Sequence, residues 1–239
     1  MIKLLITSGC SFSQVPSAAL SWPIPLSKRL NLDVECHGRG AVGNGIISRT
    51  IIHSVTDALK TYRPEELLVG IMWSGIDRFE FYKKELDIDI QYLDVSPYYT
   101  NPQNVVGPYH YALVQPSWDD ELSTIFYKNI YSDHWAAIVG YEHILRVQWF
   151  LKLKNIKYFM TGYSWDTYPQ HGAENEPDVK FLLDLVDWDN WVPEKNMDKW
   201  ARSTGLPYRL PNDYHPSTEM HQRYVDEHII PHLKNRNII

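Results

Sequence analysis

The sequence has few cysteines, no long apolar run and no cluster of basic residues, and each absence excludes a class of protein. Its 239 residues include two cysteines, Cys10 and Cys36, which are too few for a disulfide framework and lack the spacing of a zinc-ligand set. No apolar stretch approaches the roughly 18 residues that a membrane-spanning helix needs. The net charge is −6 and lysine and arginine form no run, so nothing favours a nucleic-acid backbone as a partner.

The beginning of the sequence also lacks the core of a signal peptide. Met-Ile-Lys is followed by an apolar run that is too short for such a core, and then by a glycine turn. We therefore expect the chain to be cytoplasmic at synthesis, in a compartment that keeps both cysteines reduced, with neither a membrane nor a nucleic acid as a partner.

Aromatic residues are abundant, with 9 Trp and 16 Tyr. This is more amphipathic rings than one core needs, and the surplus indicates a pocket or an interface. Many of them fall within residues 79–132 and 162–212, which show little periodicity and are long for loops of a compact domain. We expect one domain over residues 1–239, with an aromatic-rich insertion at about 79–132 that serves as a substrate-recognition cap.

Outside those two segments, apolar runs alternate with helical patterns. Expected strands are 3–7, 32–36, 67–73 and 156–160, and expected helices are 26–30, 45–62, 134–153 and 219–230, the last ended by Pro231. This alternation predicts an α/β fold in which helices cover both faces of a parallel sheet. Ligands of such sheets bind at the carboxyl ends of the strands.

Two short stretches carry the residue types of nucleophilic hydrolysis. "TSGCSFS", residues 7–13, places Ser11 directly after the first expected strand, and "PNDYHPS", residues 211–217, places Asp213 and His215 before the last helix. A hydroxyl can attack, an imidazole can accept its proton, and a carboxylate can orient the imidazole. Cys10, beside Ser11, remains a rival nucleophile.

A third stretch, "GRGAVGNG" at residues 38–45, suits an oxyanion hole. Its glycines let backbone N–H groups approach a ligand, and it opens a helix, where negative charge is favoured. The stretch lacks a Gly-Lys-Ser/Thr ending and the glycine spacing of a dinucleotide site, so no cofactor is expected. No metal is expected either, because His221 and His228 would be about 10 Å apart along a helix and Pro231 separates His228 from His232.

On these motifs the chain resembles the SGNH (GDSL-type) hydrolase superfamily, in particular members with a Gly-Cys-Ser-Phe first block. The resemblance implies a three-layer α/β/α sandwich of flavodoxin-like type, with a parallel sheet of about five strands. It implies Ser11 as nucleophile, the backbone N–H of Gly43 (followed by Asn44) as an oxyanion donor, and Asp213 and His215 as the acid and base.

The chain departs from the family pattern at two places. The usual Gly-x-Asn-Asp of the third block is here Ser74-Gly75-Ile76-Asp77, without the asparagine that completes the oxyanion hole, and Ser74 or Asn44 is the expected substitute. The usual Asp-x-x-His is shortened to Asp-x-His, with Asn212 at the family's acid position.

The resemblance leads to a functional hypothesis with one alternative. A serine hydrolase would cleave an ester through an acyl-enzyme, and the aromatic-rich segments favour a carbohydrate O-acetyl ester over other small-molecule esters. The alternative is a catalytically weak binding or structural module in a homo-oligomer or a larger assembly, which would accommodate both the missing asparagine and the aromatic surface.

Overall fold

A five-stranded parallel sheet lies at the centre of the computed structural model, which describes residues 1–15, 20–82, 92–94, 110–164, 167–168 and 172–239. The strand order is β2-β1-β3-β7-β8, and each neighbouring pair is parallel. The strands are β1 (Leu4–Gly9), β2 (Asp33–Cys36), β3 (Leu67–Trp73), β7 (Lys157–Gly162) and β8 (Trp191–Asn196). The predicted α/β fold class is confirmed.

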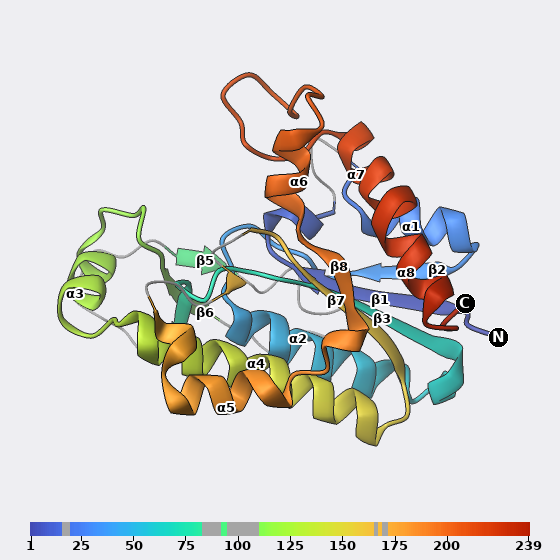
Figure 1. Ribbon diagram of the computed structural model, residues 1–239, viewed down its shortest axis with the longest axis horizontal. Coiled ribbons are helices and arrows are strands. Elements are labelled where there is room, and N and C mark those ends of the chain that lie inside the picture. Colours follow the sequence, from blue (N-terminus) through green and yellow to red (C-terminus); the bar gives the residue numbers. More distant parts are fainter. Residues whose placement is uncertain (16–19, 83–91, 95–109, 165–166, 169–171) are drawn as a thin grey trace.

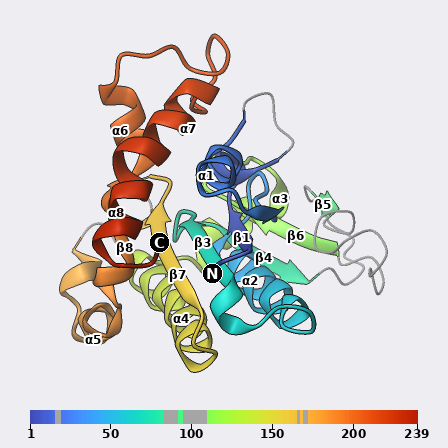
Figure 2. The ribbon, with the colours of Figure 1, turned by 90° about the vertical axis from the view of Figure 1, so that its right-hand side faces the viewer.

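Helices cover both faces of this sheet, as Figures 1 and 2 show. On one face lie α2 (Asn44–Ala58), α4 (Asp133–Leu153) and α5 (Pro177–Leu185), and on the other lie α1 (Pro23–Leu30), α7 (Thr218–Tyr224) and α8 (Ile230–Asn235). Because side chains alternate along a strand, β1 supplies both cores. Leu4 and Ile6 pack in the core under α2 and α4, while Leu5 packs in the core under α1 and α7. No described helix is long and apolar enough to cross a membrane.

The expectation that Pro231 ends the last helix is wrong. After α7 the chain forms a π-helical turn, Val225–Ile229, and then continues as α8 with Pro231 in its first turn. Proline is tolerated there because the wider π turn changes the hydrogen-bond pairing just before it, so that the missing N–H of Pro231 does not end the helix.

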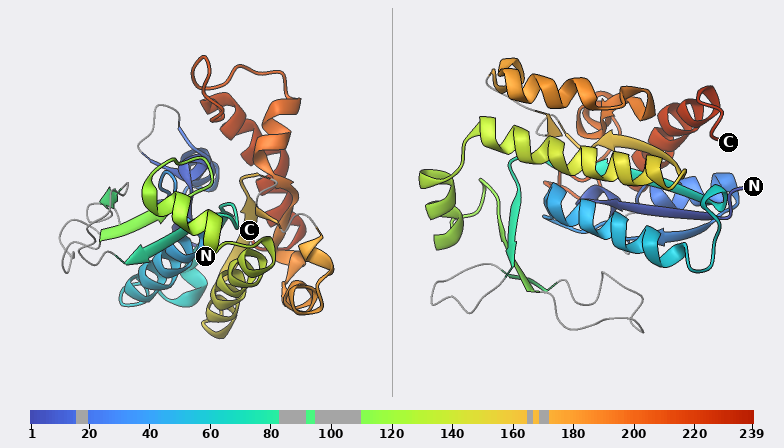
Figure 3. Two further views of the ribbon diagram at one scale, coloured as in Figure 1. Left: turned by 90° about the vertical axis from the view of Figure 1, so that its left-hand side faces the viewer. Right: turned by 90° about the horizontal axis from the view of Figure 1, so that it is seen from below.

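The segment 79–132 contains regular structure. β4 (Phe79–Tyr82), β6 (His110–Val114) and β5 (Tyr92–Asp94) form a small antiparallel sheet, which projects beside the main sheet, and α3 (Glu121–Asn129) follows it (Figure 3). Part of its aromatic content is packing: Phe79 stacks on Trp135 of α4 at 4.7 Å between ring centroids, and Phe126 is buried. Residues 83–91 and 95–109 of the predicted cap lie outside the described residues.

The segment 162–212 is likewise more regular than its pattern indicates. It contains α5, the edge strand β8 and α6 (Met197–Ser203). The fifth strand is hard to find from sequence because it pairs with β7 at only two positions and carries Pro193, a residue that sheets accept at their edges.

A buried histidine in α7 predicts a loss of stability in acid. Burial lowers the pKa of His221 from its ordinary 6.5 to about 3, and the charges of His215 and Arg209 act in the same direction. Below pH 6.5 the unfolded chain therefore binds a proton that the folded chain does not, and stability falls as the pH falls, by roughly 1.4 kcal/mol per pH unit from this group alone.

We expect His221→Leu to flatten the fall in the free energy of unfolding between pH 6.5 and pH 4.5, measured by urea titration. His53→Gln, on the exposed side of α2, is the matched control and should keep the wild-type slope. An unchanged slope in His221→Leu would assign the acid sensitivity to other groups.

Candidate active site

Ser11 is presented by a tight turn at the carboxyl end of β1. Residues Ser11–Ser13 form a single 3-10 turn, in which the Ser13 N–H donates to the carbonyl of Cys10 at 2.9 Å. The loop after β2 presses against this turn, and a Cβ at Gly38 would lie 2.2 Å from the Ser13 carbonyl oxygen. Only glycine allows that approach. The first two loops therefore form one packed platform.

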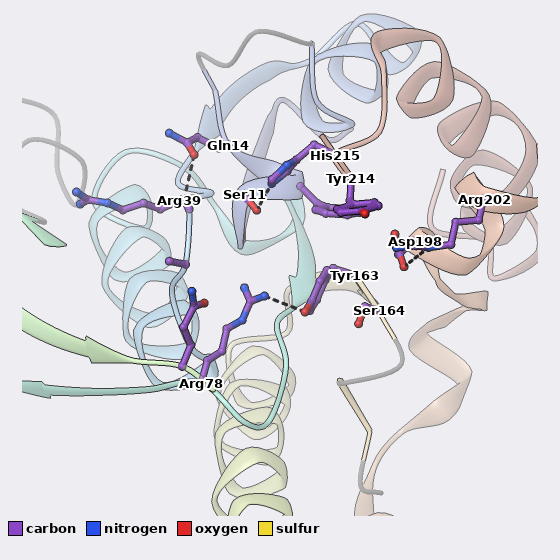
Figure 4. Close-up of a pocket in the computed structure, with 14 residues that line it drawn as sticks. Ser11, Gln14, Arg39, Arg78, Tyr163, Ser164, Asp198, Arg202, Tyr214 and His215 are labelled. Carbon is purple, nitrogen blue, oxygen red and sulfur yellow. Dashed lines mark hydrogen bonds and ion pairs between the residues drawn. The ribbon is translucent and has the colours of Figure 1, made fainter. Parts of the chain in front are cut away.

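His215 reaches Ser11 from the opposite end of the sequence. Its Nε2 lies 2.7 Å from Ser11 Oγ (Figure 4), and its Nδ1 lies 2.6 Å from Oδ1 of Asp213. With the proton on Nδ1 donated to the carboxylate, Nε2 has the lone pair that can accept the Ser11 proton. The structure thus brings Ser11, His215 and Asp213 into one hydrogen-bonded chain.

Loop geometry decides which residue stands beside the imidazole. Asn212 is exposed and has a left-handed backbone, with φ of 63°, and the Asp213 N–H donates to the carbonyl of Leu210. This turn directs Oδ1 of Asp213 to both the backbone N–H and the ring of His215, while Oδ2 accepts from Arg209 at 2.6 Å. Burial alone would raise the pKa of the Asp213 carboxyl, but the hydrogen bonds from His215 and Arg209 lower it below its ordinary value.

Cys10 is the less suitable nucleophile. Its side chain is fully buried, and burial raises the pKa of the thiol above its ordinary value, although the charge of Arg78 acts in the other direction. The reactive form of cysteine is the thiolate, which such burial disfavours. Ser11, in contrast, lines an open cavity.

That cavity has a volume of about 730 Å³ and lies beside Ser11 and His215. Its described lining is mostly polar and aromatic: Ser11, Phe12, Gln14, Arg39, Gly40, Ala41, Arg78, Gln115, Tyr163, Ser164, Asp198, Arg202, Tyr214 and His215. Of the described residues between 79 and 132, Gln115 alone contributes to it. The aromatic faces at the cavity come from the turn after β1, from the end of β7 and from the loop before α7.

The three predicted oxyanion residues, Gly43, Asn44 and Ser74, are not among the described residues that line this cavity. Asn44 accepts the backbone N–H of Ser74 at 2.8 Å and donates to the Ser74 carbonyl at 3.3 Å, so its amide fastens the start of α2 to the end of β3. Gly43 is the N-cap of α2, where a Cβ would lie 2.3 Å from the Arg78 carbonyl oxygen. The Ser74 hydroxyl accepts from Arg78 at 3.3 Å. Their roles at an oxyanion remain predictions.

Sequence reasoning missed Arg78, Tyr163 and Arg209. Arg78 could have been noticed as a charged residue just after a fully buried strand, where a ligand of a parallel sheet binds. Tyr163 follows β7 in the same way, and accepts a hydrogen bond from Arg78 at 2.9 Å. Arg209 gives no comparable signal, because only the turn at residues 210–213 brings it to Asp213.

The histidines near the carboxyl terminus serve packing. His228 lies against the rings of Trp200 and Tyr224 at 5.3 and 5.2 Å, and His232 is buried. In the part of the chain that the structure describes, no group of three or more His, Cys, Asp or Glu residues is arranged to hold a metal ion.

The fold and the site define an α/β protein with a Ser-His-Asp hydrogen-bonded chain at the carboxyl edge of its parallel sheet. The chain belongs to a family described as "Family of unknown function (DUF6071)", whose model matches residues 15–239. No curated protein shows a significant match. Among solved structures, the chain is similar to a member of the lipolytic protein G-D-S-L family from Veillonella parvula DSM 2008, with a TM-score of 0.47 and 8% identity over 94% of this chain and 97% of that one.

Proposed function

We propose that the protein is a serine hydrolase that cleaves an ester through an acyl-enzyme. The observation that carries the proposal is the unbroken hydrogen-bonded chain from Ser11 Oγ through His215 to Asp213, at the wall of an open cavity. A nucleophile, a base within hydrogen-bond reach and a group that orients the base are the combination that activates a hydroxyl.

In the proposed mechanism Ser11 Oγ adds to the carbonyl carbon while its proton passes to Nε2 of His215. The carbonyl π electrons move to the oxygen, which becomes an oxyanion, and the imidazolium is stabilised by the Asp213 carboxylate. The intermediate then expels the alcohol oxygen, which takes the proton from Nε2. Water repeats both steps on the acyl-Ser11 and releases the acid. Arg209 fixes the far carboxylate oxygen, so that Asp213 keeps its near oxygen on the ring.

The substrate we propose is a carbohydrate O-acetyl ester. Tyr163 and Tyr214 line the cavity together with Ser11 (Figure 4), and Asp198, Ser164 and Gln115 add polar groups to its walls. Flat rings with polar edges suit the apolar faces and the hydroxyl groups of a sugar. This support comes from the cavity lining itself, and the cap role of the segment at about 79–132 stays a prediction.

The test is acetate release from an O-acetylated oligosaccharide, compared between wild type and Ser11→Ala. We expect release by wild type only, and faster release than from an acetylated small alcohol, because the sugar rings contribute binding. Tyr214→Ala should reduce the rate on the oligosaccharide while leaving p-nitrophenyl acetate hydrolysis within a few-fold. Binding of the oligosaccharide without any release by wild type would favour the alternative of a binding module.

A further inference from the structure

The SGNH pattern completes the oxyanion hole with an asparagine side chain that this chain lacks. The two expected substitutes, Asn44 and Ser74, are hydrogen-bonded to other groups. Ile76, at the asparagine position, is buried, and its Cγ2 lies 2.7 Å from where a Cβ on Gly140 of α4 would stand, so its side chain packs against that helix. The Asn44 amide is bonded to the backbone of Ser74, and the Ser74 hydroxyl accepts from Arg78. The chain that leads away from β3 nevertheless places one strong donor at the cavity.

That donor is the guanidinium of Arg78. It lines the same cavity as Ser11 and His215, and Figure 4 shows the side chain reaching from the loop after β3 toward Tyr163, below Ser11 in that view. The charge of Arg78 lowers the pKa of the thiol of Cys10, the neighbour of Ser11, and so opposes the larger rise that burial causes. The positive charge is therefore at the same cavity as the nucleophile.

The guanidinium is held in place from two sides. One terminal nitrogen donates to the Tyr163 hydroxyl at 2.9 Å, and the other donates to Ser74 Oγ at 3.3 Å. The Tyr163 ring is itself fixed edge-on against Phe12, with 5.2 Å between centroids, and Phe12 directly follows Ser11. Donors that are fixed before the reaction need no reorganisation when charge develops, which is the condition for effective stabilisation of an oxyanion.

We propose that Arg78 supplies the side-chain donor of the oxyanion hole, in the place that asparagine holds in the family pattern. The inference rests on the proposed hydrolase function and adds a catalytic residue to it. When Ser11 Oγ adds to the carbonyl carbon, the carbonyl oxygen gains a negative charge, and the Arg78 guanidinium binds it by a charge-assisted N–H···O bond. No proton leaves Arg78, because guanidinium remains protonated throughout. Tyr163 acts as a positioning residue through its hydroxyl.

The test measures kcat and KM on p-nitrophenyl acetate, a neutral substrate, for Arg78→Ala with and without millimolar guanidinium chloride. We expect kcat to fall by about 10²- to 10³-fold with KM within a few-fold, because the lost interaction belongs to the transition state. Free guanidinium should restore at least part of kcat, and sodium chloride at the same ionic strength should not. Arg223→Met, which removes an exposed arginine paired with Glu227, is the matched control and should retain wild-type kcat.

Two further variants keep the inference testable if Arg78→Ala does not fold, as judged by its thermal melt. Arg78→Lys retains the charge, and Tyr163→Phe removes the hydrogen bond but leaves the ring on Phe12. Each should fold and lose kcat at nearly constant KM. A kcat equal to that of wild type in these variants, or a rise in KM with kcat unchanged, would overturn the inference. Absence of both turnover and Ser11 labelling by a phosphonate in wild type would instead overturn the hydrolase proposal, and this inference with it.

Discussion

Ser11→Ala is expected to lower the turnover of p-nitrophenyl acetate by about 10⁴-fold or more, the largest effect of any single change in this chain. The alanine removes the atom that forms the acyl bond, while the fold should be kept because Ser11 lines the cavity and its Oγ is hydrogen-bonded to His215 there. Turnover is followed by p-nitrophenolate absorbance, and a fluorophosphonate should add its mass to the wild-type peptide that contains Ser11 and to no peptide of the variant.

Cys10→Ala is the control for that experiment, because the two side chains are adjacent and only one faces the cavity. The buried thiol, with its raised pKa, should be dispensable for chemistry, so the variant should keep its labelling and most of its turnover. The opposite pattern, with labelling lost in Cys10→Ala and kept in Ser11→Ala, would assign the nucleophile to the thiol.

The central strands could be predicted because burial on both faces imposes a continuous apolar run. β3 begins and ends at the residues that its sequence pattern predicts, Leu67 and Trp73, and its side chains enter both cores. β8 could not be predicted in this way, because an edge strand with Pro193 and Lys195 has no such run. The π-helical turn before Pro231 also has no sequence pattern from which it could be predicted.

The proximity of Ser11 and His215 follows from topology, because both loops adjoin the carboxyl edge of the same sheet. Their separation of 204 positions in the chain is irrelevant once the strand order is known. The contacts that surround this pair could not be predicted in the same way. Whether Arg78 or Asn44 faces the cavity depends on the path of the loop after β3 and on the Asn44–Ser74 pair, and neither is encoded by a local pattern.

His215→Ala is expected to lower turnover nearly as much as Ser11→Ala, by about 10⁴-fold, since the two residues act as one unit. Without the imidazole to accept its proton, Ser11 would have to lose that proton to water. The absorbance of released p-nitrophenolate measures the loss, and a rate near that of wild type in His215→Ala would contradict the role of the imidazole as the base.

Asp213→Ala should cost about ten- to a hundredfold less than His215→Ala, because a Ser-His pair can still transfer the proton while the ring loses its orientation. Asn212→Gly is the matched neighbour: the side chain it removes is exposed, and glycine accepts the left-handed backbone with φ of 63°, so turnover should stay within a few-fold of wild type. The relative size of the two losses shows which of these residues orients the imidazole. Oδ1 of Asp213 lies 2.6 Å from the imidazole, so a larger loss in Asn212→Gly than in Asp213→Ala would mean that the loop rearranges during catalysis and brings Asn212 to the ring.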